Sequence, residues 1–182
     1  ATAASIYLRD YDWLQHNWDC FRRICGDTTS PFQLLPNQFG DPWQANIDNR
    51  VGIQPDVVKN GLNINGAYLD MGRSNPKPVT PLKYSSDTSQ YPQVSLNALM
   101  WAGMMLYRQG FPAFEVGDRA LMRAWQFLRR IADDYNQMAW WAADKKEDAK
   151  WIAHIAYGLP LDRYPISLPV GAHDQVGWAD WI

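Results

Sequence analysis

Apolar residues recur at helical spacing in four segments of the chain. In the first segment, residues 5–26, they follow one another at intervals of three and four, which predicts one continuous helix with Ser5 as its cap and Gly26 as its stop. The expected apolar face comprises Tyr7, Tyr11, Leu14, Trp18, Phe21 and Cys25. A second stripe with the same rhythm is polar throughout and comprises Arg9, Asp12, His16, Asp19 and Arg23.

The same period predicts three further helices. They cover about 94–108 with Gly110 as the stop, 117–135 with Asp118 near the cap, and 144–158 with Asp144 as the cap. The residues expected to face inward are Leu96, Leu99, Met100, Gly103, Leu106 and Tyr107 in the first, Leu121, Trp125, Leu128 and Ile131 in the second, and Ala149, Ile152 and Ile155 in the third. The arginines of the second are expected to face outward, and Gly158 is expected to stop the last helix.

Between the first and second helices the pattern changes to Pro, Asn, Gly and Asp punctuation over residues 28–91. Residues 44–61 are compatible with one or two short helices, whereas four prolines in 73–92 exclude a long one. A loop region of this length is usually functional. No convincing series of strands is present, so the chain, 1–182, is expected to form a single mainly α domain with long loops.

Composition narrows the function classes only in part. The chain has 182 residues, 47% hydrophobic and 20% charged, with no apolar run of membrane-spanning length. The net charge of −2 argues against a broad nucleic-acid surface. Ten Trp and nine Tyr fit a cleft that stacks against sugar rings, and they fit equally well a Trp-rich core. Cys20 and Cys25 should point in different directions on a helix, so no disulfide is expected.

Common catalytic motifs are missing from the sequence. It contains no phosphate-binding loop, zinc-ligand spacing or nucleophile elbow. His16, His154 and His173 lack partners at a recognised ligand spacing, so neither a metal nor another cofactor is expected. Tyr, Arg, Asn and His residues in or near the loops are the candidates for chemistry that remain.

Several segments, in order, resemble the alginate-lyase-like polysaccharide lyases, a family of mannuronate lyases. "NGAYLDMGR", residues 65–73, resembles the family's segment that ends in Glu-Leu-Ala-Arg, and "YPQVSLNALMWAGMMLYRQG", residues 91–110, resembles its Tyr-His segment and the helix that follows. "WIAHIAYGLP" and "GAHDQVGWADWI" are similar to the end of relatives. The resemblance covers roughly residues 60–182 and rests on the ordered set of motifs. It implies an incomplete (α/α) toroid, or its C-terminal half.

The resemblance also implies a reaction, the β-elimination of an acidic, uronate-containing polysaccharide such as alginate. Arg73, at the position of the family's arginine, would neutralise the sugar carboxylate and stabilise the charge that spreads onto it in the transition state. Tyr91, at the position of the family's catalytic tyrosine, would act as general base, general acid or both. The structural alternatives are a loop-anchoring ion pair for Arg73 and a packing role at the helix mouth for Tyr91.

The sequence departs from the family's pattern at three points. The segment between the arginine and the tyrosine is longer here than in the family. Lys83 or Tyr84 is therefore an alternative to Arg73 or Tyr91 in the binding or catalytic role. The histidine that neighbours the family's tyrosine is replaced by Pro92. The family's Asn-Asn-His segment has its nearest match in His16 and Asn17, which are therefore a candidate base and a candidate substrate-binding residue. The neighbouring Trp18 is also a candidate substrate-binding residue, and an exposed histidine on a polar stripe is the alternative for His16.

Members of this family are longer than 182 residues, so the chain is expected to be a fragment, a cleaved chain or a reduced relative, with further chains as candidates to complete the toroid. The family's habits and the small residues "ATAAS" at the start favour a periplasmic or secreted location. Two rival hypotheses stay open. One is a carbohydrate-binding or structural module without catalysis. The other is an interaction protein with Trp140, Trp141 and Trp151 in an exposed apolar patch.

Overall fold

The structure is a computed structural model that describes residues 1–37, 40–74, 77–78, 91–134 and 148–158. The side chains of residues 73–74, 91, 93, 131–134 and 148–151 lie outside this description, although their helical backbone is included. The elements are α1 (Thr2–Leu8), α2 (Tyr11–Ile24), the 3-10 turn η1 (Asp41–Trp43), β1 (Val58–Lys59), β2 (Leu62–Asn63), α3 (Met71–Ser74), α4 (Tyr91–Arg108), α5 (Val116–Asp134) and α7 (Asp148–Tyr157). The described part is mainly helical, which confirms the predicted fold class at that level.

The segment predicted as one helix from Ser5 to Gly26 forms two. Arg9 adopts a left-handed backbone with φ of 55°, and the Asp10 side chain then caps α2 by accepting a hydrogen bond of 2.9 Å from the backbone N–H of Trp13. The break reorients the first turns, so that Tyr7 and Tyr11 are 87% and 74% exposed instead of lying on the apolar face. The rest of that face, from Leu14 to Cys25, is buried as predicted.

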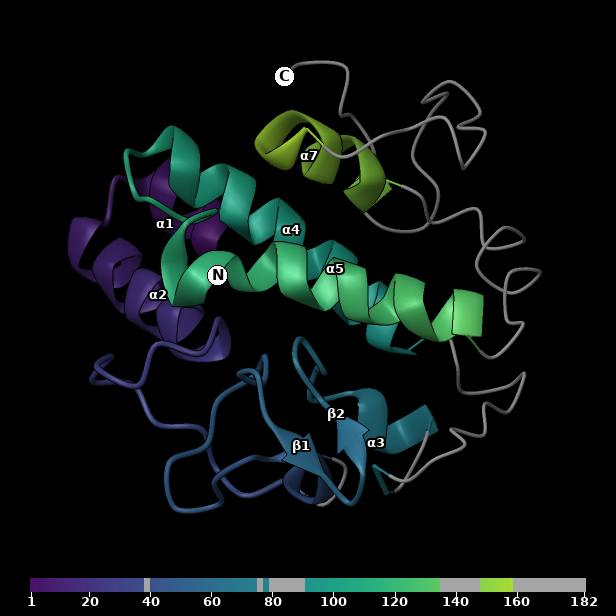
Figure 1. Cartoon of the computed structure of the whole chain (residues 1–182). Helices are drawn as coiled ribbons and strands as arrows, with labels where there is room; N and C mark the ends of the chain where they lie inside the picture. Colours follow the sequence, from purple (N-terminus) through teal and green to yellow (C-terminus); the bar gives the residue numbers. More distant parts are fainter. Residues whose placement is uncertain (38–39, 75–76, 79–90, 135–147, 159–182) are drawn as a thin grey trace.

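Helix α4 is the centre of the fold. It contacts α1, α2, α3, α5 and α7, which explains why its sequence is the most uniformly apolar of the long helices. In Figure 1, α5 crosses the middle of the view, α7 lies above it and the loop region lies below. The fully buried large side chains include Trp43, Ile53, Ile64, Met71, Leu96, Met100, Leu106, Leu121, Leu128 and Ile152. Helices and loop region therefore share one core.

One helix end differs from the prediction, two agree with it, and two residues predicted to face inward are exposed. Helix α4 begins at Tyr91, earlier than predicted, because a proline in the first turn is compatible with helical backbone. Tyr107 of α4 is 57% exposed and Ile155 of α7 is 47% exposed, so neither faces inward as predicted. Gly110 and Gly158 end their helices with positive φ, as expected for stop glycines. The proposed cap Asp144 lies outside the described residues.

The start of α5 also corrects the sequence prediction. Gly117, Asp118 and Arg119 all have positive φ, so Asp118 lacks the extended backbone of a cap residue. The turn brings Gly117 so close to α2 that a Cβ there would lie 1.8 Å from the carbonyl oxygen of Cys25. Only a residue without a side chain fits at this position.

The loop region from about 27 to 70 contains no helix in 44–61, a segment that the sequence left compatible with one or two short helices. Besides η1, its described part contains a hairpin in which Val58 pairs with Asn63 across a two-residue Asn-Gly turn, although no strands were predicted. Two buried glutamines satisfy the backbone elsewhere. Gln44 donates to the carbonyl of Val51 and accepts from its N–H, at 2.7 and 3.0 Å, and Gln54 accepts from the N–H of Ala45 at 2.8 Å.

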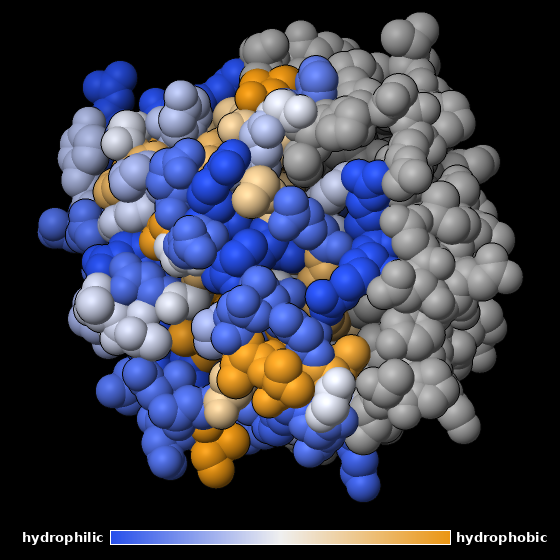
Figure 2. All heavy atoms as spheres, in the orientation of Figure 1, coloured by the Kyte–Doolittle hydropathy of each residue, from blue (hydrophilic) through white to orange (hydrophobic). Residues whose placement is uncertain are grey.

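Both cysteines are free, as the helical spacing predicted, with Cys25 fully buried. Within the described ranges, no helix has the length and apolar character needed to cross a membrane. Figure 2 shows a band of hydrophilic residues over α5 and an apolar patch over the loop region below it. The exposed large apolar side chains of the loop region include Leu35, Ile47 and Val58.

Candidate functional site

The two residues to which the resemblance assigns catalysis are carried by neighbouring elements. Arg73 belongs to α3 and Tyr91 is the first residue of α4. The two helices pack against each other, and the Ser95 hydroxyl of α4 donates a hydrogen bond to the carboxylate of Asp70, directly before α3. The fully buried Met71 fixes α3 in the core. These contacts hold α3 and α4 against each other.

The other predicted residues of this region, Lys83 and Tyr84, lie outside the described residues, as do the side chains of Arg73 and Tyr91. Trp140, Trp141 and the side chain of Trp151, which would form the apolar patch of an interaction protein, also lie outside them.

His16 lies in a surface groove between two aromatic side chains. Its ring stacks on Trp13 with a centroid distance of 5.1 Å and meets the Phe32 ring edge to face at 5.7 Å. Asp19, Pro31 and Gln33 complete the lining of a groove of about 380 Å³, called here the aromatic groove. His16 is exposed and Trp13 is 50% exposed, so flat ring surface is available to a ligand.

Local hydrogen bonds explain how the chain builds the aromatic groove. Trp13 and His16 are three residues apart on α2, which places them on one side of the helix. The Ser30 hydroxyl donates to the carbonyl of Asp19 at 2.6 Å and accepts from the N–H of Phe32 at 3.2 Å, which returns the loop to α2. The Asp19 carboxylate pairs with Arg22 at 3.4 Å. Because the Asp19 carboxylate is negatively charged, the groove suits the uncharged ring faces of a sugar better than it suits an anionic group of the ligand.

The neighbours of His16 have structural roles in α2. The Asn17 amide donates to the Ser5 hydroxyl at 3.2 Å and ties α2 to α1. Trp18 is 8% exposed, with its ring stacked near Phe21 and Phe111 at centroid distances of 5.9 and 4.9 Å. Its position is that of a core residue, so the aromatic surface of this region comes from Trp13.

The polar stripe of α2 is not exposed throughout, because Arg23 is 5% exposed. Its guanidinium reaches across to the loop region, where it donates to the carbonyl of Thr28 and to the side chain of Asn49. Because Asn49 is distant in the sequence, the helical pattern of α2 does not predict that Arg23 is buried.

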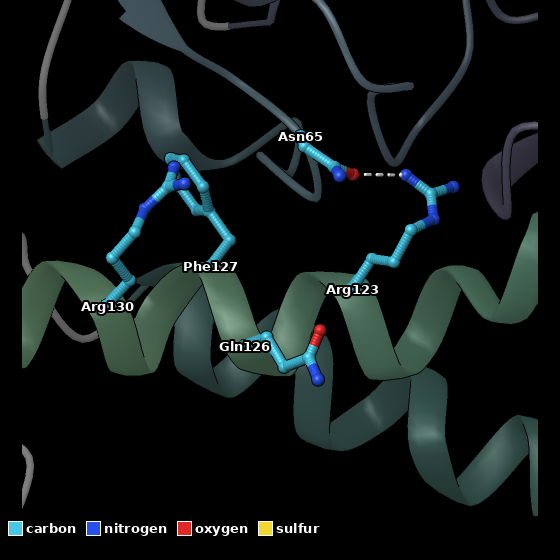
Figure 3. Close-up of a pocket in the computed structure, with 5 residues that line it drawn as sticks. All are labelled: Asn65, Arg123, Gln126, Phe127 and Arg130. Carbon is cyan, nitrogen blue, oxygen red and sulfur yellow. Dashed lines mark hydrogen bonds between the residues drawn. The ribbon is translucent and has the colours of Figure 1, made fainter.

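A second depression, called here the arginine pocket, lies between α5 and the loop that follows the hairpin. Figure 3 shows Arg123 and Arg130 extending from α5 on either side of Asn65, with Phe127 beside Arg130. Gln126 completes the lining of this space of about 130 Å³. Arg123 and Arg130, two of the arginines that were predicted to face outward, therefore turn toward the loop region. A spacing of seven on the helix, with an aromatic residue between them, was the only available signal in the sequence.

Arg123 connects the segments that surround the arginine pocket. Its Nη1 donates to the carbonyl of Gln54 at 2.7 Å and to Oδ1 of Asn65 at 2.8 Å, and its Nη2 donates to the carbonyl of Gly117 at 2.7 Å. Burial lowers the pKa of this guanidinium, and the charge of Asp118 opposes the shift. Carbonyl acceptors that solvate the cation compensate part of the cost of burying it.

Arg130 is held more loosely. Its Nη2 donates to the carbonyl of Asn63 at 2.7 Å, and its guanidinium lies 5.2 Å from the centroid of the Phe127 ring. One hydrogen bond leaves most of the five N–H groups of an arginine available.

Tyr157, in the "WIAHIAYGLP" segment of the resemblance, is a packing residue. Burial raises the pKa of Tyr157, whose hydroxyl donates to the carbonyl of Phe114 at 2.9 Å. Burial also raises the pKa of Tyr68, with the charge of Asp70 adding to the effect. The raised pKa keeps both phenols protonated, so neither tyrosine is suited to accept a proton as a general base.

In the described ranges, no group of three or more His, Cys, Asp or Glu side chains is placed to hold a metal ion. His154 lies in α7, and His173 is outside the described residues. Fold and depressions together define a mainly helical protein with an aromatic groove on α2 and an arginine pocket on α5. No protein-family model, curated protein or solved structure matches the chain.

Proposed function

We propose that the protein cleaves an acidic, uronate-containing polysaccharide such as alginate by β-elimination. The proposal combines the resemblance of residues 65–73 and 91–110 with one structural observation. The hydrogen bond between Ser95 and Asp70 and the packing of α3 on α4 hold together the two elements that carry Arg73 and Tyr91. A binding group and a proton-transfer group on adjacent elements are what the reaction needs.

In the proposed reaction, Arg73 binds the carboxylate of the uronate and stabilises the negative charge that develops when C5 loses its proton. Tyr91 acts as a phenolate and removes that proton, the bond between C4 and the glycosidic oxygen breaks, and a double bond forms between C4 and C5. The glycosidic oxygen then takes the proton from the Tyr91 phenol, which returns to the phenolate. The step consumes no water and needs no oxidant.

The aromatic groove adds a contact surface for the polymer to this proposal. Trp13 and His16 offer ring faces on which a sugar ring can stack. We assign His16 to this contact, because its neighbours are aromatic rings and no described residue orients it as a base.

The test is the ultraviolet absorbance of the unsaturated product during incubation with a panel of uronate polymers. Tyr91→Phe should abolish the rise in absorbance while leaving polymer binding nearly unchanged. Tyr107→Phe is a matched control, because Tyr107 lies on the same helix and is 57% exposed. Wild-type turnover in the Tyr91 variant would refute the catalytic assignment.

The second candidate function is carbohydrate binding without cleavage. The exposed Trp13 ring beside His16 favours it, since a stacking surface serves binding with or without chemistry. This alternative predicts that no uronate polymer is cleaved and that Trp13→Ala weakens polymer binding at least about fivefold, in line with the free energy of an aromatic contact. Unchanged polymer affinity in the Trp13 variant would exclude the aromatic groove from binding.

A further inference from the structure

We propose that the arginine pocket binds the carboxylate of an acidic sugar, through residues to which the resemblance assigns no role. The choice of a sugar carboxylate rests on the proposed function, whereas the affinity for an oxyanion rests on the pocket alone. Arg130 is the ligand-binding cation, and Arg123 is the residue that shapes the pocket around it.

The hydrogen bonds of the two arginines support this division. Arg123 uses Nε, Nη1 and Nη2 in four bonds to protein oxygens, because its Nε also donates to the carbonyl of Asp118 at 3.0 Å. Arg130 makes one such bond, to Asn63. A guanidinium with several available N–H groups matches the two oxygens of a carboxylate.

The charge of the pocket also favours an anion. Within the described residues, neither Arg123 nor Arg130 forms an ion pair, and every acceptor of their hydrogen bonds is a neutral oxygen. The nearby Asp56 carboxylate accepts from the side chain of Asn63 at 2.9 Å. The carboxylates of Asp118 and Asp56 act on Arg123 from a distance, but within this part of the chain neither forms an ion pair with Arg123 or Arg130. An anionic ligand would supply a directly paired counter-charge.

The two amides of the lining fit the hydroxyl groups of a sugar. Gln126 is exposed, and the Asn65 Nδ2 group has no partner among the hydrogen bonds of the described residues, so both amides offer donors. Phe127 holds the guanidinium of Arg130 over its ring. Phe127 is buried and serves to position Arg130, so the ligand would meet a cationic group and two amides, which suit the carboxylate and hydroxyl groups of a single uronate unit.

The experiment is a calorimetric titration at low ionic strength with mannuronate, with mannose and with sodium sulfate. Mannose and mannuronate differ in the carboxylate, so mannuronate should bind at least about tenfold more tightly to the wild-type chain. Arg130→Gln should weaken mannuronate binding by about tenfold or more. Arg9→Gln makes the same change of charge at an exposed position between α1 and α2 and should leave binding unchanged.

Gln126→Glu provides a second variant that preserves folding. Residue 126 is exposed and precedes Arg130 by four positions on α5, so the introduced carboxylate can pair with the arginine and slightly favour the helix. It should therefore weaken mannuronate binding without lowering the urea midpoint of unfolding.

Three results would overturn the inference. They are equal affinity in the Arg130 and Arg9 variants, equal affinity for mannose and mannuronate, and binding of sulfate alone. Turnover is measured separately by absorbance. Polymer cleavage without Arg130-dependent binding would refute only this inference, and Arg130-dependent binding without cleavage would refute only the proposed function.

Discussion

Replacement of Gly66 by alanine should test the packing of the loop region on α5. Gly66 has a φ of +82°, and its N–H donates to the carbonyl of Gln54 at 3.1 Å. A Cβ at this position would lie 2.1 Å from the carbonyl oxygen of Arg123 and 2.5 Å from its carbonyl carbon. Because these atoms belong to the backbone of a long helix, they cannot rotate away as a side chain would.

Two costs add in this variant. An L-residue with left-handed backbone costs roughly 1–2 kcal/mol, and forcing extra volume into a packed contact costs about 1–3 kcal/mol more. The sum of roughly 2–5 kcal/mol is a large fraction of the 5–15 kcal/mol that usually separates folded and unfolded states. We therefore expect Gly66→Ala to be strongly destabilised.

Gly61→Ala is the matched control. Gly61 has nearly the same φ, +81°, but a Cβ there would meet no heavy atom within 4 Å. Its cost should be only the roughly 1–2 kcal/mol of the backbone conformation. Urea unfolding followed by tryptophan fluorescence gives both free energies of unfolding. Values for the two variants that agree within about 0.5 kcal/mol would refute the close approach of this loop to α5.

Three further predictions concern stability. Leu121→Ala should lower the free energy of unfolding by about 2–5 kcal/mol in urea titrations, because this side chain is fully buried. Asp10→Ala should cost about 0.5–2 kcal/mol, because α2 loses its cap, and Asp10→Asn should restore most of this. The hydrogen bond from Arg50 lowers the pKa of Asp41, so this carboxylate stabilises the folded state above its usual pKa of about 4 and loses that contribution as pH falls through the lowered value. Asp41→Asn should reduce the pH dependence of the urea midpoint below about pH 4, and an unchanged dependence would contradict the reasoning.

The helical period predicted the parts of the fold that apolar burial dictates. Leu14, Phe21, Leu99, Leu121 and Leu128 are buried where the pattern placed them. Burial of one face of a helix depends mainly on residues close in sequence, so one chain contains enough information to predict it.

The prediction failed where hydrogen bonds decided the structure. Asp10 was overlooked as a cap because the apolar period runs through the break between α1 and α2. The hairpin was overlooked because its strands have two residues each, too few for an alternating pattern, although the Asn60-Gly61 pair is a strong turn signal. The buried Arg23 reaches an acceptor 26 positions away, which a local pattern cannot show.

The candidate site divides in the same way. The resemblance identified Arg73 and Tyr91, whose assigned roles stay predictions, and the adjacency of their helices adds support that the sequence alone lacked. The arginine pocket was not predicted, because the residues that it joins, from Gln54 to Arg130, are distant in sequence and polar.

The irregular loop region owes its position to polar contacts as well as to apolar burial, and this has a consequence for the arginine pocket. Arg123 connects the loop at Gln54 and Asn65 with the turn at Gly117, so its removal would leave several carbonyls without partners and displace the loop. Arg130 makes a single bond to the hairpin at Asn63. Substitution of Arg123 should therefore impair folding and ligand binding together. Substitution of Arg130 should weaken ligand binding and leave folding largely unchanged. For this reason Arg130 is the residue at which the proposed binding of an acidic sugar can be distinguished from the stability of the fold.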